Sequence, residues 1–439
     1  MESVDALIHG RWVIPVEPEG TVLERHAIAV RDGRIVAILP SREAEHRYRT
    51  ETCHRFERHA LIPGLVNAHT HAAMSLLRGL ADDLPLMEWL NEHIWPAESR
   101  WVNVEFVRDG TELAVAEMLR SGTTCFNDMY FFPDVTADVA TRTGIRAVIG
   151  LIVIDFPTAW AENADEYLHK AIDVHDRFRS DPLIRCAFAP HAPYTVSDGP
   201  LERIRTYAEE LDIPIHIHLH ETEHEVEEAV KRDGRRPLQR LDDLRLLSPR
   251  LLAVHMTQLE REEIERFSAC GGHVVHCPES NLKLASGFCP VQRLLDAGVN
   301  VALGTDGAAS NNDLDMMGEM RSAALLAKAV AKQPAAVPAA RALEMATLGG
   351  ARALGLDDTI GSLKPGKAAD IVAVDLANIE TQPGYHPLSQ LVYAAGRQHV
   401  TDVWVAGRHL LKERRLTSLD EQVILEKAAR WQNRIRVNA

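Results

Sequence analysis

The chain has 439 residues, of which 46% are apolar and 25% are charged, and its formal net charge at pH 7 is −15. A chain of this length buries a large core and has room for more than one domain. The acidic balance argues against nucleic acids and anionic membranes as partners, because both bind basic surfaces.

The chain begins with the acidic segment 1–5 and shows no charged-then-apolar export signal. No apolar run approaches the ~20 residues that a membrane span needs. The six cysteines are widely scattered and form no CxxC pair, so we expect buried free thiols. These features predict a cytoplasmic protein in a reducing compartment.

Both ends of the chain have the pattern of short antiparallel strands. Residues 27–30 and 34–39 flank an Arg-Asp-Gly turn, which is a hairpin signal. Similar strands are predicted near the other end, at 369–375 and 402–408. We therefore expect residues 1–60 and 365–439 to form one small β-sandwich, followed by a final packing helix over 419–435.

Between these ends, residues 61–364 alternate predicted strands with predicted helices. The eight strands are expected at 61–66, 123–128, 146–153, 184–191, 213–218, 251–255, 272–276 and 299–306. Helices are expected at 105–120, 134–143, 165–179, 201–211, 223–231, 261–269 and 291–297, with two more at 313–331 and 337–354. Strand–helix alternation implies parallel pairing with helices outside. The predicted fold class is therefore α/β, a (β/α)8 TIM-type barrel with a small sandwich beside it.

The first barrel strand ends in a His-x-His pair, His69 and His71. Side chains two apart on a strand point to the same side, so both imidazoles can face one divalent ion. A His-x-His pair alone more often consists of ordinary polar residues that bind no metal. Here three further strands also end in ligand-type residues, at 213–218, 251–255 and 299–306. Ligand-type residues at the carboxyl ends of several strands are typical of a barrel active site.

The candidate metal ligands are His69, His71, one histidine of the 213–221 stretch, His255 and Asp306. Period 2 places His216, His218 and His220 on one face of that strand. Only one of them need bind the metal, and another can fill a lower layer of the barrel. Spacing favours His218, because Glu221 follows it at a distance that suits a substrate above the metal. The alternative for Glu221 is a solvated carboxylate at a helix start, since further glutamates follow it.

The whole chain resembles the amidohydrolase superfamily, in its branch of purine-nucleoside and aminotriazine deaminases. It is most similar to the 5-methylthioadenosine/S-adenosylhomocysteine deaminase family. The stretches that carry the resemblance are 63–71 (PGLVNAHTH), 218–222 (HLHET), 253–255 (AVH), 281–287 (NLKLASG), 303–307 (LGTDG) and 361–370 (GSLKPGKAAD).

The resemblance implies a metal held by His69, His71, His218 and Asp306. Relatives with two metals usually carry a carboxylated lysine on the fourth strand, but residues 184–191 contain no lysine. We therefore expect one Zn²⁺ per chain, although His/Asp sets accept Fe²⁺ or Mn²⁺ as well.

The resemblance also implies catalytic roles. His255 would hydrogen-bond the attacking water and stabilise charge during the attack. Glu221 would protonate the ring nitrogen next to the carbon attacked. Asp306 would take a proton from the water and deliver it to the departing ammonia.

The substrate residues implied are Glu98, which matches a carboxylate that binds ribose hydroxyls, and His191, which ends the fourth strand. Trp95 and Trp89 are expected in a long loop after the first strand, either lining an apolar pocket or simply packing. His191 has the alternative of a buried, hydrogen-bonded histidine. Residues 281–287 are expected to form a loop at the barrel mouth, with no assigned role.

The sequence departs from the family where relatives that accept S-adenosylhomocysteine carry arginines for its carboxylate. Those positions align near Leu151 and Trp160, with Arg142 and Arg146 close by. An unpaired buried carboxylate costs several kcal/mol. The apolar residues favour 5′-methylthioadenosine as substrate, with S-adenosylhomocysteine and adenosine as further substrates.

Two other functions compete with this one. A hydrolase acting on triazines or other nucleobases fits the same fold, but Glu98 argues against it. A metal-free structural protein is a second alternative, and the complete ligand set argues against that. The expected partners are a small nucleoside and further copies of this chain, as a dimer or tetramer.

Overall fold

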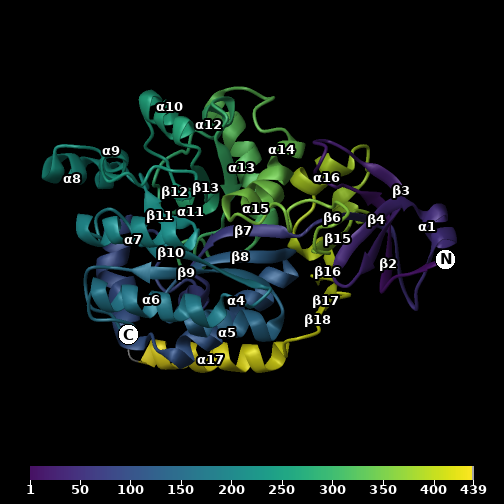
Figure 1. Cartoon of the computed structure of the whole chain (residues 1–439), viewed down its shortest axis with the longest axis horizontal. Helices are drawn as coiled ribbons and strands as arrows, with labels where there is room; N and C mark the ends of the chain where they lie inside the picture. Colours follow the sequence, from purple (N-terminus) through teal and green to yellow (C-terminus); the bar gives the residue numbers. More distant parts are fainter. Residues whose placement is uncertain (438–439) are drawn as a thin grey trace.

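The computed structural model describes residues 1–437 and places a ring of parallel strands beside a second sheet (Figure 1). In the ring each strand pairs with the next one along the chain, and all pairs are parallel. The strands are β7 (Leu65–Thr70), β8 (Thr123–Met129), β9 (Arg146–Val153), β10 (Ile184–Pro190), β11 (Ile215–Leu219), β12 (Leu251–His255), β13 (His273–His276) and β14 (Asn300–Leu303). The predicted barrel fold is confirmed.

The first and last strands of the ring are joined mainly through side chains and one backbone contact. Asn67 donates to the Thr305 hydroxyl at 2.8 Å and accepts from the Thr305 amide at 3.0 Å. The Asp306 amide donates to the His69 carbonyl at 3.0 Å. This closure brings residues that are more than two hundred positions apart in the sequence to the same point of the barrel rim.

Helices cover the outside of the barrel. They are α4 (Val104–Arg120), α5 (Pro133–Thr143), α6 (Ala164–Phe178), α7 (Asp198–Leu211), α8 (Glu223–Asp233), α9 (Pro237–Asp243), α10 (Arg261–Cys270), α12 (Val291–Asp296) and α13 (Met316–Ala331). Helix α6 illustrates why they form. The Asn163 side chain caps its first turn by accepting from the Glu166 amide, and a buried stripe runs from Tyr167 to Phe178 at helical spacing. Burying each such apolar side chain stabilises the fold by about 1.5–3 kcal/mol.

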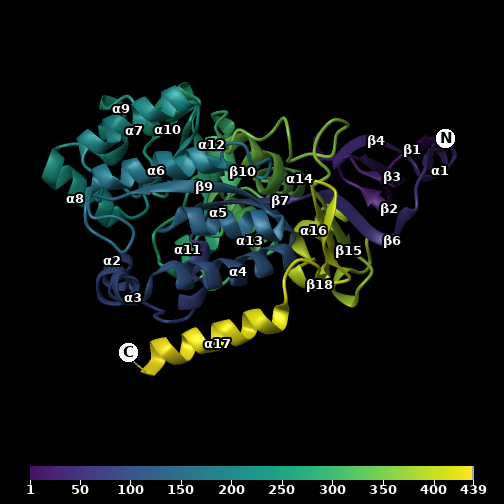
Figure 2. The same cartoon turned by 60° about the horizontal axis from the view of Figure 1, so that its bottom comes forward.

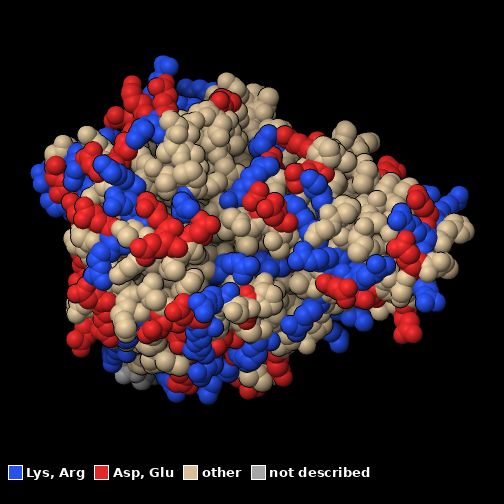
Figure 3. Space-filling view, in the orientation of Figure 1, with Lys and Arg blue, Asp and Glu red and all other residues tan. Residues whose placement is uncertain are grey.

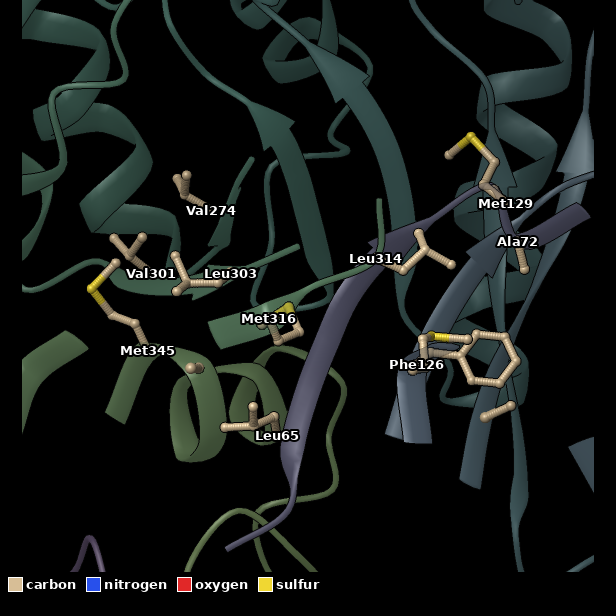
Figure 4. Close-up of a cluster of buried hydrophobic side chains, with 14 of the residues drawn as sticks. Leu65, Ala72, Phe126, Met129, Val274, Val301, Leu303, Leu314, Met316 and Met345 are labelled. Atoms are coloured by element: carbon tan, nitrogen blue, oxygen red, sulfur yellow. The ribbon is translucent and has the colours of Figure 1, made fainter. Parts of the chain in front are cut away.

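The barrel strands separate two apolar layers. Alternate residues such as Val66, Val275 and Ala302 face the barrel interior. Their neighbours Leu65, Val274 and Leu303 face outward and join the layer between the strands and the surrounding helices (Figure 4). Period 2 along each strand therefore fills the inside of the barrel and its helical coat at once.

The two chain ends together build the second sheet, in the order β18-β17-β16-β15-β6-β2-β3-β4. Its members are β2 (Ala6–Val13), β3 (Leu23–Arg31), β4 (Arg34–Pro40), β6 (Thr52–Pro63), β15 (Ile371–Asp375), β16 (Val400–Val405), β17 (Arg408–Lys412) and β18 (Arg415–Leu416). The N-terminal strands meet the C-terminal ones where β6 pairs antiparallel with β15, from Pro63 opposite Ile371 to His59 opposite Asp375. The predicted union of the two ends is therefore confirmed.

The last helix, α17 (Glu421–Val437), leaves this sheet and runs along the barrel beside α4 (Figure 2). Trp431 packs edge-on against Phe106 with ring centres 5.2 Å apart, and its indole N–H donates to Asp109 at 3.0 Å. Lys427 bridges Asp109 and Glu112 at 2.9 and 2.6 Å. On the face shown in Figure 3, acidic and basic side chains are interspersed.

One segment expected to be a loop is helical, so that prediction is wrong. The stretch after β7 contains α2 (Leu86–Glu88), a wider turn at Trp89–Ile94 and α3 (Trp95–Trp101). Pro96 lies in the first turn of α3, where no amide hydrogen is needed, so it does not break the helix. In the stretch expected as a mouth loop, 281–287, the first three residues end α11 (Pro278–Lys283), and the other four form neither helix nor strand.

The predicted helix over 337–354 is split into α14 (Ala339–Glu344), a wider turn at Met345–Gly349 and α15 (Gly350–Ala353). In residues 1–437 no helix combines the length and the apolar character that crossing a bilayer requires.

Candidate metal centre

Four ligand-type side chains converge at the carboxyl ends of the barrel strands. They are His69, His71, His218 and Asp306, and one ligand atom from each lies within 4.8 Å of the others. Asp306 Oδ1 is 3.2 Å from the Nε2 atoms of both His69 and His71. His218 Nε2 is 3.2 Å from His69 Nε2. Three imidazoles and one carboxylate form a donor set that suits Zn²⁺.

The histidine rings are held with Nε2 toward this centre. His71 Nδ1 lies 2.6 Å from the Met129 carbonyl, and His218 Nδ1 lies 2.8 Å from the His191 carbonyl. Because a carbonyl only accepts, each Nδ1 donates a hydrogen bond, and in the neutral form of each ring Nε2 keeps a lone pair for a metal. Burial and the neighbouring imidazoles hold the pKa of His218 well below its ordinary value, which favours the neutral, ligating form.

The centre also stabilises positive charge. Burial by itself disfavours a charged His71, but hydrogen bonding to Asp306 and the charge of that carboxylate outweigh it and raise the pKa of His71 to about 9. Burial opposes the Asp306 charge as well, yet hydrogen bonds from His69 and His71 hold the pKa of Asp306 well below its ordinary value. A cation is therefore favoured at this point, and the residues present fit a divalent metal.

Two serines fix the second oxygen of Asp306. The hydroxyls of Ser280 and Ser310 each donate to Oδ2 at 2.7 Å. The Gly307 amide donates to Oδ1 at 2.8 Å. Oδ1 is thereby turned toward the histidines, and neither serine was assigned a role from the sequence.

Several site residues adopt left-handed backbone conformations at the strand ends. The φ angles are 51° at His220, 74° at His255, 50° at Met256 and 64° at Asp306. Such conformations cost non-glycine residues of order 1–3 kcal/mol each and gather at functional sites. They turn the chain sharply just past the barrel rim.

This turn makes the expectation that three histidines share one face wrong for His220. Its Nδ1 lies 3.1 Å from the Gln258 carbonyl, and its Nε2 accepts from the Leu238 amide at 3.0 Å. The ring therefore faces away from the metal centre. His218 faces the centre, and His216 lies below it against His69.

Glu221 follows the turn and is buried, so it is not a solvated carboxylate at a helix start. Its Oε1 is 3.7 Å from His255 Nε2. Burial raises the pKa of Glu221, which favours a protonated carboxyl that can donate. Glu225 holds this residue in place, because its two oxygens accept from the amides of His220 and Glu221 at 3.2 and 2.7 Å.

His255 is oriented by Asn281, the first residue of a stretch that carried no assigned role. Asn281 Oδ1 lies 2.8 Å from His255 Nδ1. An amide oxygen accepts, so Nδ1 carries the proton and Nε2 faces Glu221. Asn281 belongs to α11, which places its side chain beside His255.

A cavity of about 390 Å³ opens above the metal centre, and the predicted catalytic and substrate residues line it together. They are Glu221, His255, Asp306, Glu98, His191 and Trp95. His191 Nδ1 lies 3.0 Å from the Thr195 hydroxyl, and burial, with the charges of nearby histidines, lowers the pKa of its ring to about 3. Burial raises the pKa of Glu98 to about 7, although Tyr130 and His71 oppose the shift.

The remaining walls of the cavity are largely apolar. Trp95 packs edge-on against Phe156, with ring centres 5.9 Å apart. Trp89 and Leu90 come from the turn before α3, and Ile152 comes from β9. No lysine or arginine of the described chain lines this cavity.

The prediction that Leu151 and Trp160 lie beside the substrate is wrong. Leu151 points outward from β9 into the helical coat, because its neighbour Ile152 takes the cavity side. Trp160 packs against Phe132 with ring centres 5.2 Å apart. Arg146, the nearby alternative, pairs with the buried Asp370 at 3.3 Å.

Comparisons with known proteins agree with this geometry. The pattern described as "Amidohydrolase family" matches residues 60–410. A 5-methylthioadenosine/S-adenosylhomocysteine deaminase of Teredinibacter turnerae is 50% identical over 99% of this chain and 98% of its own length. One of Saccharophagus degradans is 51% identical over 98% and 97%. The crystal structure of an adenosine deaminase from Xanthomonas campestris with bound zinc superposes with a TM-score of 0.98, at 57% identity over 99% of both chains.

Proposed function

Because the chain belongs to the amidohydrolase family, and within it to the 5-methylthioadenosine/S-adenosylhomocysteine deaminases, we propose that it deaminates 5′-methylthioadenosine. The enzyme is a metal-dependent hydrolase. The products are 5′-methylthioinosine and ammonia. One observation carries the proposal: Glu221 and His255 share one cavity with Glu98, above the His/Asp metal centre.

His69, His71, His218 and Asp306 would hold the metal, which we propose is one Zn²⁺ per chain. When bound, such an ion lowers the pKa of a water molecule toward ~7 and so supplies a nucleophile at neutral pH.

The chain's own residues move the protons. The Asp306 carboxylate, oriented by Ser280 and Ser310, accepts a proton from the attacking water and passes it to the departing amine. Glu221, whose pKa is raised by burial, acts in its protonated form and donates to the ring nitrogen beside the carbon attacked. His255, with its Nδ1 proton on Asn281, presents Nε2 to the oxygen being added. Each positioned proton transfer contributes about 10²–10⁴ to the rate.

The ribose and its 5′ substituent occupy the other end of the cavity. Glu98 accepts from the ribose hydroxyls, and His191 contacts the nucleoside from the end of β10. The aromatic pair Trp95 and Phe156 surrounds the methylthio group. No lysine or arginine among the lining residues meets the amino-acid carboxylate of S-adenosylhomocysteine.

The cavity therefore favours methylthioadenosine over S-adenosylhomocysteine. A carboxylate without a partner costs about 1.5–3 kcal/mol relative to one bound by arginine, which corresponds to roughly 10–100-fold in kcat/KM. The test is ammonia release from methylthioadenosine, adenosine, S-adenosylhomocysteine, guanine and melamine. Equal kcat/KM on the first and third compounds contradicts the specificity, and turnover of melamine alone contradicts the nucleoside assignment.

A positive charge added to the cavity wall should reduce the difference in kcat/KM between methylthioadenosine and S-adenosylhomocysteine. Ile154 lines the cavity beside Phe156, so Ile154→Arg should raise kcat/KM for S-adenosylhomocysteine relative to methylthioadenosine. Ile154→Leu is the matched control, because it changes shape without adding charge, and should leave the ratio unchanged. An unchanged ratio in Ile154→Arg would mean that the carboxylate lies elsewhere.

The proposal also covers the localisation and the oligomeric state of the enzyme. We place it in the cytoplasm as a homo-oligomer, a dimer or tetramer, that does not bind nucleic acid or membranes. Exposed apolar side chains on adjacent helices, Leu282 of α11 and Leu325 of α13, support self-association. Light scattering of the purified protein measures the oligomeric state, and a monomer at micromolar concentration contradicts it.

A further inference from the structure

A buried pair of side chains, His216 and Asn127, lies directly beneath the metal ligand His69. His216 Nε2 is 2.9 Å from His69 Nδ1, and its ring is fully buried with its centre 4.9 Å from that of His69. His216 Nδ1 is 3.2 Å from the Asn127 amide nitrogen. That nitrogen also donates to the Ala68 carbonyl at 2.9 Å.

The ligand role of His69 fixes where its proton lies. Its Nε2 faces Asp306 and His218, so the lone pair on Nε2 binds the metal and the proton of the neutral ring lies on Nδ1. That proton points at His216 Nε2, which must accept it. His71 and His218 donate their second ring N–H to backbone carbonyls, whereas His69 donates to another titratable ring.

The same reasoning then fixes His216. It is fully buried and hydrogen-bonds to no carboxylate among the described residues, so it is neutral. With Nε2 accepting, its single proton lies on Nδ1 and needs an acceptor. The atom placed there is the Asn127 nitrogen, which is a donor. The Asn127 oxygen, meanwhile, is buried without a hydrogen-bond partner in the described chain.

We propose that His216 and Asn127 are positioning residues that fix the metal-binding tautomer of His69. In the metal-loaded protein the chain of hydrogen bonds runs from His69 Nδ1 to His216 Nε2, and from His216 Nδ1 to Asn127 Oδ1. To present that oxygen, the Asn127 side chain turns so that Oδ1 faces His216 Nδ1 and moves away from the Ala68 carbonyl, because two acceptor oxygens repel each other. The hydrogen bond to that carbonyl is lost. The inference rests on the metal part of the proposed function and is independent of the substrate.

Zinc affinity, measured by competition with a chelator, tests the pair without any reference to activity. His216→Phe keeps the ring shape and removes the acceptor, so the Kd for zinc should rise by about 10–100-fold, while saturating zinc still fills one site per chain. Asn127→Asp places an acceptor opposite His216 Nδ1 and should bind zinc at least as tightly as the wild type. Asn127→Leu removes the acceptor and should bind zinc more weakly than either.

The matched control is His220→Phe. Like His216, His220 is a buried histidine; it lies just after β11, and its ring contacts Gln258 and Leu238 instead of a ligand. Its Kd for zinc should stay within about threefold of the wild type, since it orients no ligand. A wild-type Kd in His216→Phe, or an equal loss in His220→Phe, overturns the proposal.

Ring ¹⁵N spectra of the zinc-loaded wild-type protein give a second readout that needs no variant of His216 to fold. The proton of His216 should be found on Nδ1. A proton on Nε2 would mean that His69 does not donate to it, and the inference would be wrong.

Discussion

The position of the Glu221 carboxyl depends mainly on how the backbone at His220 and Glu221 is held. The left-handed turn at His220 and the two oxygens of Glu225 fix where Glu221 leaves the chain. Thr257 adds a hydrogen bond to the Glu221 carbonyl at 2.7 Å. A proton donor held in this way acts only if it carries a transferable proton.

Glu221→Gln keeps the shape and removes that proton. We expect kcat to fall by at least ~10² with zinc content unchanged, because an acid catalyst is lost and no ligand is touched. Steady-state kinetics and elemental analysis measure the two effects. Glu223→Gln, an exposed carboxylate on the next helix, should behave like the wild type. Near-normal kcat in Glu221→Gln would mean that Glu221 lies beside the substrate but does not act as the acid.

The three histidines of the β11 region should differ in their effect on metal content. His218→Ala removes a ligand and should empty the site, whereas His220→Ala should retain one ion per chain. His216→Ala should retain the ion at saturating zinc with weaker affinity. A full complement of zinc in His218→Ala would contradict the ligand set.

At this scale the sequence predicted residue types better than residue environments. The His-x-His spacing and the strand-end aspartate led to the four side chains that the structure brings together. Left-handed turns are not encoded by any local signal at His220, so its orientation was missed. Asn281, Ser280 and Asn127 act through contacts with residues distant in sequence, which only the closed barrel creates.

Among the elements, α17 docks on the barrel through a buried tryptophan, Trp431, and through charged contacts such as those of Lys427. Trp431 is 2% exposed and combines a ring contact with Phe106 and a hydrogen bond to Asp109. Trp431→Ala should lower the free energy of local opening of α17 by ~3–5 kcal/mol, the usual cost of deleting a buried tryptophan side chain.

Hydrogen exchange of the α17 amides measures this opening directly. Leu425, which is 61% exposed on the same helix, supplies the control, because Leu425→Ala should change the opening by less than ~0.5 kcal/mol. Equal protection of α17 in Trp431→Ala and the wild type would show that its charged contacts suffice to dock it.

The elements also show where the apolar periodicity of the sequence predicts the structure and where it does not. Most strand and helix positions in the barrel follow the sequence closely, since each strand is a short apolar run between helical stripes. The first strand is an exception: it was expected at 61–66 but lies at Leu65–Thr70, because Leu61 and Ile62 belong to β6 and pair with β15. The face of β9 that meets the cavity was misjudged by one residue, and a one-residue shift exchanges the two sides of a strand. The helical segment before Val102 was missed because its tryptophans and proline suggest a loop.

For the molecule as a whole, metal binding should couple to stability. The ligands come from three separate strand ends, so they form one site only in the folded barrel. Zinc at 100 times its Kd should stabilise the fold by about 2.7 kcal/mol. Thermal melts of chelated and zinc-loaded protein measure the shift, and His218→Ala should show none. Two ions per chain in fully active enzyme would contradict the single-metal assignment.

The pairing of β6 with β15 has a consequence for how the protein is made. On the ribosome, β6 emerges early, but the strand that completes its hydrogen bonds follows only at Ile371. At about 5–20 residues per second, the intervening stretch of roughly 300 residues takes ~15–60 s to translate. During that time the nascent chain carries an open strand edge at Ala60–Ile62, and such edges recruit other chains. The open edge of β6 is therefore covered only after most of the barrel has been synthesised.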